Sequence, residues 1–309
     1  MSRFPAEALS RITLGTVQFG MPYGKAKPTL PPDARTLAAT LDAAVDGGIT
    51  CLDTAGNYGD AESRIGGWLR GRRDRPLIVS KLPPVDRPDE VVPGHVDTCL
   101  AASLAALGVD RLDGYLVHRA DDLHRPGVAD RLRAAVEDGR IRTFGVSVYE
   151  PQQLDRALAV AGIGAVQLPA SVFDQRFADA GLIGRCADRG IVVFVRSLFL
   201  QGALFLEPDR LPPHLQPLQP AMRHLRAIAA EAGCPLASLA LAAVLTLPGV
   251  TSAVIGVGSP QELCDNLAAC KAMPPDEAAA AGARKAAGGL PEAILDVRRW
   301  PAYSGRSGS

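Results

Sequence analysis

The chain has 309 residues, of which 47% are hydrophobic and 21% charged, and its formal net charge is zero. This composition is ordinary for a globular protein that is long enough to bury a full hydrophobic core. The charge balance argues against electrostatic binding to nucleic acid or anionic lipid, and no apolar run reaches the roughly 18 residues that a membrane helix needs.

The six cysteines are scattered, and no C-x-x-C pair occurs. That pattern argues against a disulfide framework and against a structural zinc site, so no metal is expected. The N-terminal residues Met1 to Glu7 lack the apolar stretch of a secretory signal. Together these features predict a cytoplasmic protein with no membrane or nucleic-acid partner.

Short apolar runs alternate with longer amphipathic segments along most of the chain. The runs predict buried parallel strands at residues 11–16, 48–53, 77–81, 112–118, 141–147, 165–168, 191–195 and 253–255. The segments between them predict helices at residues 33–46, 61–72, 91–107, 128–138, 151–161, 178–189, 220–232 and 260–269. This α/β pattern favours a (β/α)8 TIM barrel over a doubly wound sheet, because no glycine-rich dinucleotide motif follows the first strand.

We expect one domain over residues 1–309, with a barrel core at about 11–270. The proline-rich stretch at about 199–219 follows the seventh strand and is expected to form a lid or wall at the carboxyl-end rim. The alanine-rich tail covers about 274–309, and its last few residues are expected to be disordered.

Four polar residues lie at or just after the ends of predicted strands, namely Asp53, Tyr58, Lys81 and His118. The carboxyl ends of barrel strands share one rim, where barrel enzymes keep their chemistry. A lysine beside a tyrosine favours the phenolate, so the pKa of Tyr58 is expected to fall while Asp53 keeps the lysine charged. Each residue alone has a structural explanation, such as an ion pair between Lys81 and Asp53, but together they predict a catalytic set.

An ordered series of motifs resembles the aldo-keto reductase superfamily, from about Ile12 to Leu267. The motifs are Leu14-Gly15-Thr16, Asp53-Thr54-Ala55 with Tyr58-Gly59 and Glu62, Ser80-Lys81, His118, Gly145-Val146-Ser147, Gln167 and Asp265-Asn266. The resemblance implies a barrel enzyme that uses NAD(P)H to transfer a hydride between nicotinamide and the carbonyl or alcohol of a small aldehyde, ketone or sugar. It also implies Tyr58 as the general acid, with Lys81 and Asp53 behind it and His118 orienting the substrate.

The same resemblance implies cofactor contacts from Gly15, Thr16, Asp53, Ser147, Gln167, Arg196, Ser197, Leu198, Gln201, Gly256, Ser259, Glu262 and Asn266. It implies substrate contacts from Phe19, Tyr23, Tyr58, His118 and Phe199. Two positions depart from the family's pattern: Val148 stands where an asparagine is usual, and Arg196 replaces an aromatic residue that stacks on the nicotinamide. Arg196 can stack on that ring, read a substrate carboxylate or sugar hydroxyl, or pair with a nearby acid.

The cofactor preference depends on the segment from Ile255 to Glu262, which offers glycines and an acid where NADP-binding relatives offer basic residues. Glu262 would repel a 2′-phosphate and accept a hydrogen bond from a free ribose hydroxyl. This favours NADH, unless a basic residue such as Lys271 reaches the site. NAD use would in turn favour oxidation of a sugar hemiacetal.

Two other functions are open on the sequence. A barrel that binds the cofactor but turns over slowly would be a sensor or a partner subunit, although such a protein need not keep a proton donor. A lyase or isomerase would need a metal cluster or a Schiff-base lysine, and no convincing metal-ligand spacing occurs. Family resemblance favours a monomer, with a dimer as the alternative.

Overall fold

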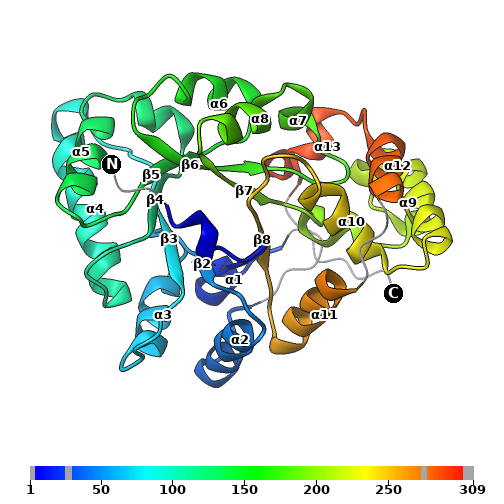
Figure 1. Cartoon of the computed structure of the whole chain (residues 1–309), viewed down its shortest axis with the longest axis horizontal. Coiled ribbons are helices and arrows are strands. Elements are labelled where there is room, and N and C mark those ends of the chain that lie inside the picture. Colours follow the sequence, from blue (N-terminus) through cyan, green and yellow to red (C-terminus); the bar gives the residue numbers. More distant parts are fainter. Residues whose placement is uncertain (1–3, 25–29, 273–276, 302–309) are drawn as a thin grey trace.

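Parallel strands close into a barrel in sequence order, and helices surround it (Figure 1). The computed structural model describes residues 4–24, 30–272 and 277–301. The strands are β1 (Ile12–Gly15), β2 (Cys51–Asp53), β3 (Leu77–Leu82), β4 (Gly114–Val117), β5 (Phe144–Ser147), β6 (Ile163–Pro169), β7 (Val192–Arg196) and β8 (Ser252–Gly256). The closed parallel barrel confirms the fold predicted from the alternating pattern.

The helices follow the strands as predicted, with some additions. They are α1 (Val17–Gly20), α2 (Ala34–Asp46), α3 (Ala61–Leu69), α4 (Val92–Leu107), α5 (Val128–Glu137), α6 (Pro151–Ala157), α7 (Arg176–Asp179), α8 (Leu182–Asp188), α9 (Gln219–Glu231), α10 (Leu236–Leu245), α11 (Pro260–Lys271), α12 (Glu277–Ala287) and α13 (Glu292–Leu295). The single helix predicted at 178–189 is wrong, because Gly181 adopts a left-handed conformation (φ 68°) between α7 and α8.

The core of the barrel has two parts. Helix residues pack against the outward faces of the strands in the largest apolar cluster, which includes Leu41, Ile65 and Leu100. A smaller cluster combines side chains from β2, β3, β4, β6 and β7 with Phe4, whose ring packs edge-on against Phe194 with 5.6 Å between centroids. Because these strands lie around the barrel, their shared cluster fills its interior below the carboxyl-end rim.

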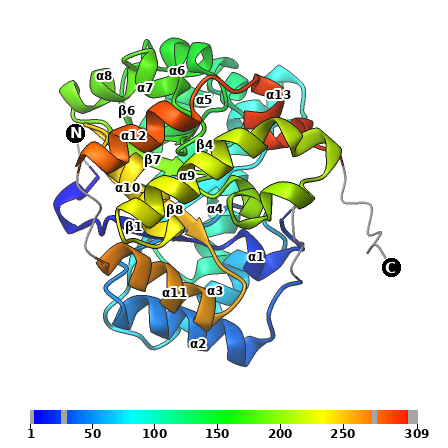
Figure 2. The same ribbon diagram turned by 90° about the vertical axis from the view of Figure 1, so that its right-hand side faces the viewer.

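A second group of helices packs beside the barrel. Helices α9, α10, α12 and α13 share a separate apolar cluster that includes Met222, Leu239 and Trp300, and α9 and α12 lie side by side in Figure 2. The predicted lid region forms three short 3-10 helices, η4 (Leu200–Phe205), η5 (Pro208–Arg210) and η6 (Pro213–Leu218). Their buried leucines belong to the same apolar cluster, so this region packs against the helices beside the barrel.

The C-terminal tail is ordered where the structure describes it. Residues 277–301 form α12, α13 and the 3-10 helix η7 (Val297–Arg299). The disorder predicted for the last few residues concerns positions 302–309, which lie outside the described residues. Among described residues no single helix is long and apolar enough to cross a membrane, and the pair Pro213–Glu231 and Leu236–Leu245 meets the length and composition criteria only together, with a bend of 98°.

Candidate active site

Strand geometry brings the predicted polar residues to one rim. Side chains two residues apart on a strand point to the same face. The interior cluster contains Cys51, Val79, Leu116, Ala165 and Phe194. Two positions further along each chain segment stand Asp53, Lys81, His118, Gln167 and Arg196. The barrel interior is therefore apolar at its base and polar at its carboxyl end.

Asp53 and Lys81 form a buried ion pair at the centre of this rim. Lys81 Nζ lies 2.8 and 2.7 Å from the two carboxylate oxygens of Asp53 and donates to the Thr54 carbonyl oxygen at 2.9 Å. Gln167 Nε2 donates to Asp53 Oδ1 at 2.7 Å. Burial lowers the pKa of Lys81, and the carboxylate of Asp53 opposes that shift. The pair is fixed in place, and its two charges cancel.

Tyr58 lies against this pair, with Lys81 Nζ 5.0 Å from the centroid of its ring. Burial and the negative charge of Asp53 raise the pKa of Tyr58, and the charge of Arg196 opposes the rise. The predicted fall in the pKa of Tyr58 is therefore wrong. Asp53 neutralises the charge of Lys81, and a buried phenolate is costly, so the lowering expected from Lys81 does not prevail.

His118 stands beside Tyr58, with the two rings edge to face and 5.7 Å between centroids. Its Nδ1 is 3.0 Å from Oδ1 of Asn57, in the same loop as Tyr58. Burial, together with the positive charges of Lys81 and Arg196, lowers the pKa of His118 from 6.5 to about 3. His118 is therefore neutral at ordinary pH. The contact with Asn57 was not anticipated, because an asparagine in a glycine-rich loop looks like a turn residue.

Two glycines hold the Tyr58 loop against α1. A Cβ added at Gly20 would lie 1.8 Å from the carbonyl oxygen of Tyr58, and one added at Gly59 would lie 2.1 Å from the carbonyl oxygen of Gly20. Gly59 also has a positive φ of 58°. Only glycine fits at either position, and the close approach fixes the backbone that carries Tyr58.

A cavity of about 670 Å³ opens at this rim, a volume typical of ligand-binding pockets. The predicted site residues that line it are Gly15, Thr16, Tyr23, Asp53, Tyr58, Gln167, Arg196, Ser197, Leu198, Phe199, Gln201, Gly256, Glu262 and Asn266. Lining residues that the sequence did not single out include Gln18, Phe205 and Ala237, and Asp265, noted only as part of a family motif, lines the cavity too. Ala237 belongs to α10, a helix that was not predicted at all.

Some predicted site residues lie elsewhere. Phe19 is completely buried in the barrel core, so its predicted substrate contact is wrong: α1 turns its ring inward. Ser147 is 2% exposed and does not line the cavity. Ser259 caps α11 by accepting from the backbone N–H of Glu262 at 3.2 Å, which is a structural role. Lys81 and His118 stand behind and beside Tyr58 and are outside the lining set.

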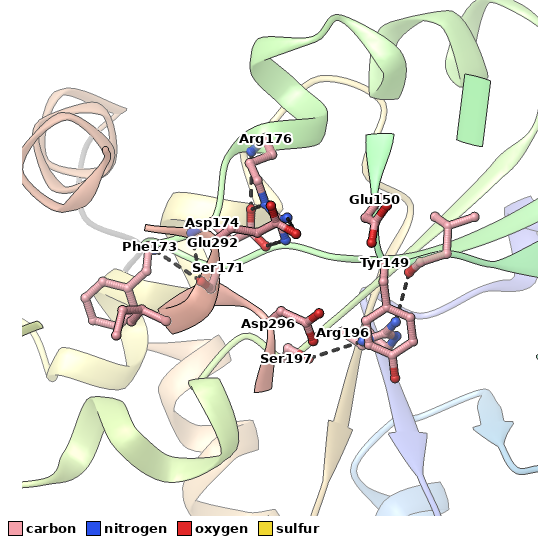
Figure 3. A network of polar contacts seen from close by, with 12 residues as sticks. Tyr149, Glu150, Ser171, Phe173, Asp174, Arg176, Arg196, Ser197, Glu292 and Asp296 are labelled. Carbon is pink, nitrogen blue, oxygen red and sulfur yellow. Dashed lines mark hydrogen bonds and ion pairs between the residues drawn. The ribbon is translucent and has the colours of Figure 1, made fainter. Parts of the chain in front are cut away.

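Arg196 makes an unexpected set of contacts (Figure 3). Its guanidinium carbon lies 4.0 Å from the centroid of the Tyr149 ring, and its Nη2 donates to the Val148 carbonyl oxygen at 2.9 Å. Arg298, from the C-terminal segment, also lies over the Tyr149 ring, at 3.7 Å. The predicted alternative of a structural pair between Arg196 and an acid is wrong for the described residues, since its hydrogen-bond acceptors are this carbonyl and Ser197 Oγ at 3.5 Å.

The loop after β7 carries unusual backbone conformations. Ser197, Leu200 and Gln201 all have positive φ, at 65°, 47° and 52°. Such conformations cost of order 1 kcal/mol each for non-glycine residues and cluster at functional sites. Ser197 and Gln201 line the cavity, so the strain lies in the cavity wall.

The opposite end of the cavity is formed by β8 and α11. Glu262 Oε2 accepts from the backbone N–H of Gly258 at 2.7 Å, and Glu262, Asp265 and Asn266 all line the cavity. Lys271 ends α11 and does not line the cavity, whereas the lining residues of this helix lie between Glu262 and Asn266. Arg196 is the cavity-lining cation among the described residues, and it belongs to the other end.

The residues present fit an extended dinucleotide. Gly15 and Gly256 line the cavity without side chains of their own, and the amide of Gln18 lies close to Gly256, where an added Cβ would be 2.6 Å from Oε1. The cavity runs from Tyr58 past these glycines to Glu262, Asp265 and Asn266 of α11, whose side chains can accept hydrogen bonds from ribose hydroxyls. No group of three or more potential metal ligands was found among the described residues.

The match to a family model is decisive. Residues 11–284 match the model of the aldo/keto reductase family. The chain belongs to this family. The aldo/keto reductase model thus spans the barrel and reaches into α12, and the resemblance inferred from the ordered motifs is confirmed.

Individual relatives share about a third or less of their residues with this chain over the matched regions. The chain is 34% identical to the 6-dehydroglucose reductase of Novosphingobium aromaticivorans over 160 residues, covering 47% of this chain and 51% of that protein. It is 29% identical to the aldo-keto reductase yakc [NADP(+)] of Schizosaccharomyces pombe over 199 residues, covering 59% and 58%. The matched region thus spans little more than half the length of these curated relatives. A crystal structure of the putative aldo-keto reductase PA4992 from Pseudomonas aeruginosa is 27% identical, with a TM-score of 0.63 over 84% of this chain and 89% of that one.

Proposed function

We propose that this aldo/keto reductase is an NADH-dependent enzyme that reduces the carbonyl group of a small aldehyde, ketone or sugar. The observation that carries the proposal is Tyr58, packed between the Asp53–Lys81 pair and the neutral ring of His118. A proton donor is thereby fixed at the mouth of a cavity that fits the cofactor.

Bound nicotinamide supplies the hydride. Tyr58 Oη keeps its proton because burial raises the pKa of the phenol, and it donates that proton to the carbonyl oxygen as negative charge develops there. The Asp53–Lys81 pair holds the ring of Tyr58 in place, with the ammonium 5.0 Å from the ring centroid, and the positive charge of Arg196 favours the phenolate that remains. The raised pKa suits an acid better than a base, which favours reduction over the oxidation that NAD use alone suggested.

His118 orients the carbonyl group in this proposal. A neutral imidazole donates from only one nitrogen, and the partner of the other nitrogen selects which one. When the Asn57 amide turns its oxygen to Nδ1, Nε2 is an acceptor; when it turns its NH2 group there, Nε2 carries the proton and donates to the carbonyl oxygen. We therefore assign Asn57 a positioning role through His118.

The preference for NADH rests on the charges around α11. Glu262 and Asp265 line the far end of the cavity, where a 2′-phosphate would meet two carboxylates and no described basic side chain. A free ribose hydroxyl can instead donate to a carboxylate. The name of the yeast relative includes NADP(+), so this chain would differ from it in cofactor. A sugar-like aldehyde fits the name of the Novosphingobium relative.

Turnover of the wild type and of Tyr58→Phe with NADH and a panel of small aldehydes tests the proposal. The variant should lose about 10²- to 10⁴-fold in kcat, the usual contribution of a general acid. Fluorescence titration should give the same Kd for NADH in both proteins, because the phenyl ring preserves the packing.

Three outcomes would contradict the proposal in different ways. Full turnover by Tyr58→Phe would remove Tyr58 from the chemistry. Tight NADH binding without turnover of any carbonyl by the wild type would favour the sensor or partner-subunit alternative. Failure of the folded protein to bind either NADH or NADPH would remove the oxidoreductase assignment.

A further inference from the structure

The two arginines that contact the Tyr149 ring differ in their charge partners. Arg298 Nη2 lies 2.7 Å from Asp296 Oδ2, its Nε also donates to Asp296 at 2.9 Å, and Glu150 lies 3.7 Å away. Arg196, in contrast, bonds a carbonyl oxygen and a hydroxyl, and neither carries a charge. Among the described residues, the positive charge of Arg298 is therefore neutralised, whereas that of Arg196 is not.

Arg196 is also held rigidly. The Tyr149 ring lies against its guanidinium (Figure 3), and the Val148 carbonyl oxygen accepts from Nη2 at 2.9 Å. Arg196 is half-buried and lines the cavity. A planar cation that is pre-positioned in this way loses little entropy when it binds a planar anion.

The direction of the Arg196 side chain separates it from the adenosine end of the cavity. Around the barrel the order runs β5, β6, β7, β8, β1. Arg196 starts from β7 and reaches past β6 to the Val148 carbonyl oxygen, directly after β5. It therefore turns away from β8 and α11 and towards the side of the rim that carries His118.

Arg196 provides the uncompensated charge at this end of the cavity. Asp53 and Lys81 cancel each other, and His118 is neutral because its pKa is lowered to about 3. Arg196 and Tyr58 line the same cavity, and the positive charge of Arg196 opposes the rise in the pKa of Tyr58. Apolar groups such as Leu198 and Phe199 form the neighbouring wall, and such surroundings strengthen an ionic contact.

We infer that Arg196 forms a carboxylate-binding subsite, so that the preferred substrate of this enzyme is a small aldehyde or ketone that carries a carboxylate. This inference rests on the proposed reductase function and adds its substrate class. Tyr149 acts as a positioning residue that holds the guanidinium towards the substrate side of the rim, because its ring lies against that guanidinium.

The test compares 4-formylbenzoate with its methyl ester, two aldehydes that differ in one negative charge. Wild-type enzyme with saturating NADH should show the higher kcat/KM for the carboxylate. Arg196→Gln should lower the ratio of the two kcat/KM values by about 10- to 100-fold, the usual worth of a hydrogen bond to a charged group. Arg196→Lys, which keeps the charge but loses the planar stack, should give an intermediate ratio.

Arg298→Gln is the matched control, because it removes a neutralised arginine from the same tyrosine ring. It should change the ratio much less than Arg196→Gln. An equal change in both variants would overturn the inference, as would a wild-type enzyme that reduces the ester as well as the acid. A weaker Kd for NADH in Arg196→Gln with an unchanged ratio would assign Arg196 to the cofactor. Reduction of neither aldehyde, nor of any other carbonyl, would instead count against the proposed function.

Discussion

The two ends of the cavity are built in opposite ways. At the catalytic end, Asp53 and Lys81 are almost completely buried and each polar atom has a partner. At the other end, the hydrogen bonds of Glu262 and Asp265 are solvent-exposed, and both residues belong to one helix. The groups proposed for chemistry are thus locked inside the barrel, whereas those proposed to select the cofactor stand on its surface. Substitutions at the first end should cost folding and catalysis together, and substitutions at the second should change preference alone.

The largest effect is expected from breaking the buried pair. Lys81→Met leaves the carboxylate of Asp53 buried without its cation, which typically costs about 3–5 kcal/mol of stability. Chemical denaturation should show this loss, and turnover should fall with it. The double variant Asp53→Asn with Lys81→Met removes both charges and should recover most of the stability without recovering activity. A single variant as stable as the wild type would contradict the description of a tightly coupled pair.

A smaller effect is expected at the adenosine end. Glu262→Arg should shift the ratio of the Kd values for NADPH and NADH by about 10-fold towards NADPH, since it replaces a repulsive charge with an attractive one at an exposed site. Glu262→Gln keeps an oxygen that can accept from Gly258. Its Kd ratio should lie between those of the wild type and Glu262→Arg. Fluorescence titration measures both constants, and thermal unfolding should change only slightly, because Glu262→Arg removes an exposed hydrogen bond and an acid from the first turn of α11. If the wild type already prefers NADPH, the proposed preference for NADH is wrong.

The smallest effect is expected at Asn57. Asn57→Leu should lower kcat by about 2- to 10-fold, because it removes one hydrogen bond from His118. Asn57→Asp should raise the pKa of His118 by about 1 to 3 units, since a carboxylate stabilises the imidazolium. Because the pKa of His118 is about 3 in the wild type, its NMR titration should begin only in strong acid, and that of the aspartate variant at clearly higher pH. Identical titrations would show that Asn57 does not control the ring.

Much of the barrel was predictable because its strands are short apolar runs at regular spacing. Helix α10 was missed because seven of its ten residues are buried, which leaves no polar face and hence no helical period to detect. The strand-end residues Asp53, Lys81 and His118 were predictable from their positions alone. The pKa of Tyr58 was not, because its sign depends on burial and on a charge balance that only three-dimensional contacts define.

The surroundings of Arg196 lie beyond sequence reasoning for a different reason. Tyr149 follows β5, whereas Arg298 belongs to η7, about 150 positions later in the chain. No local pattern links these two residues. The sequence departs from the family's aromatic residue at position 196, but that departure does not indicate which residues surround Arg196.

The contact between Gly20 and Gly59 sets a limit on how this enzyme can diversify. Both positions meet backbone atoms rather than movable side chains, so no neighbouring substitution can make room for a larger residue. Libraries aimed at new substrates can therefore vary Tyr23, Phe199 and Phe205 along the cavity wall, while these two glycines stay constant. Residues that can vary thus line the same site whose backbone depends on two invariable glycines.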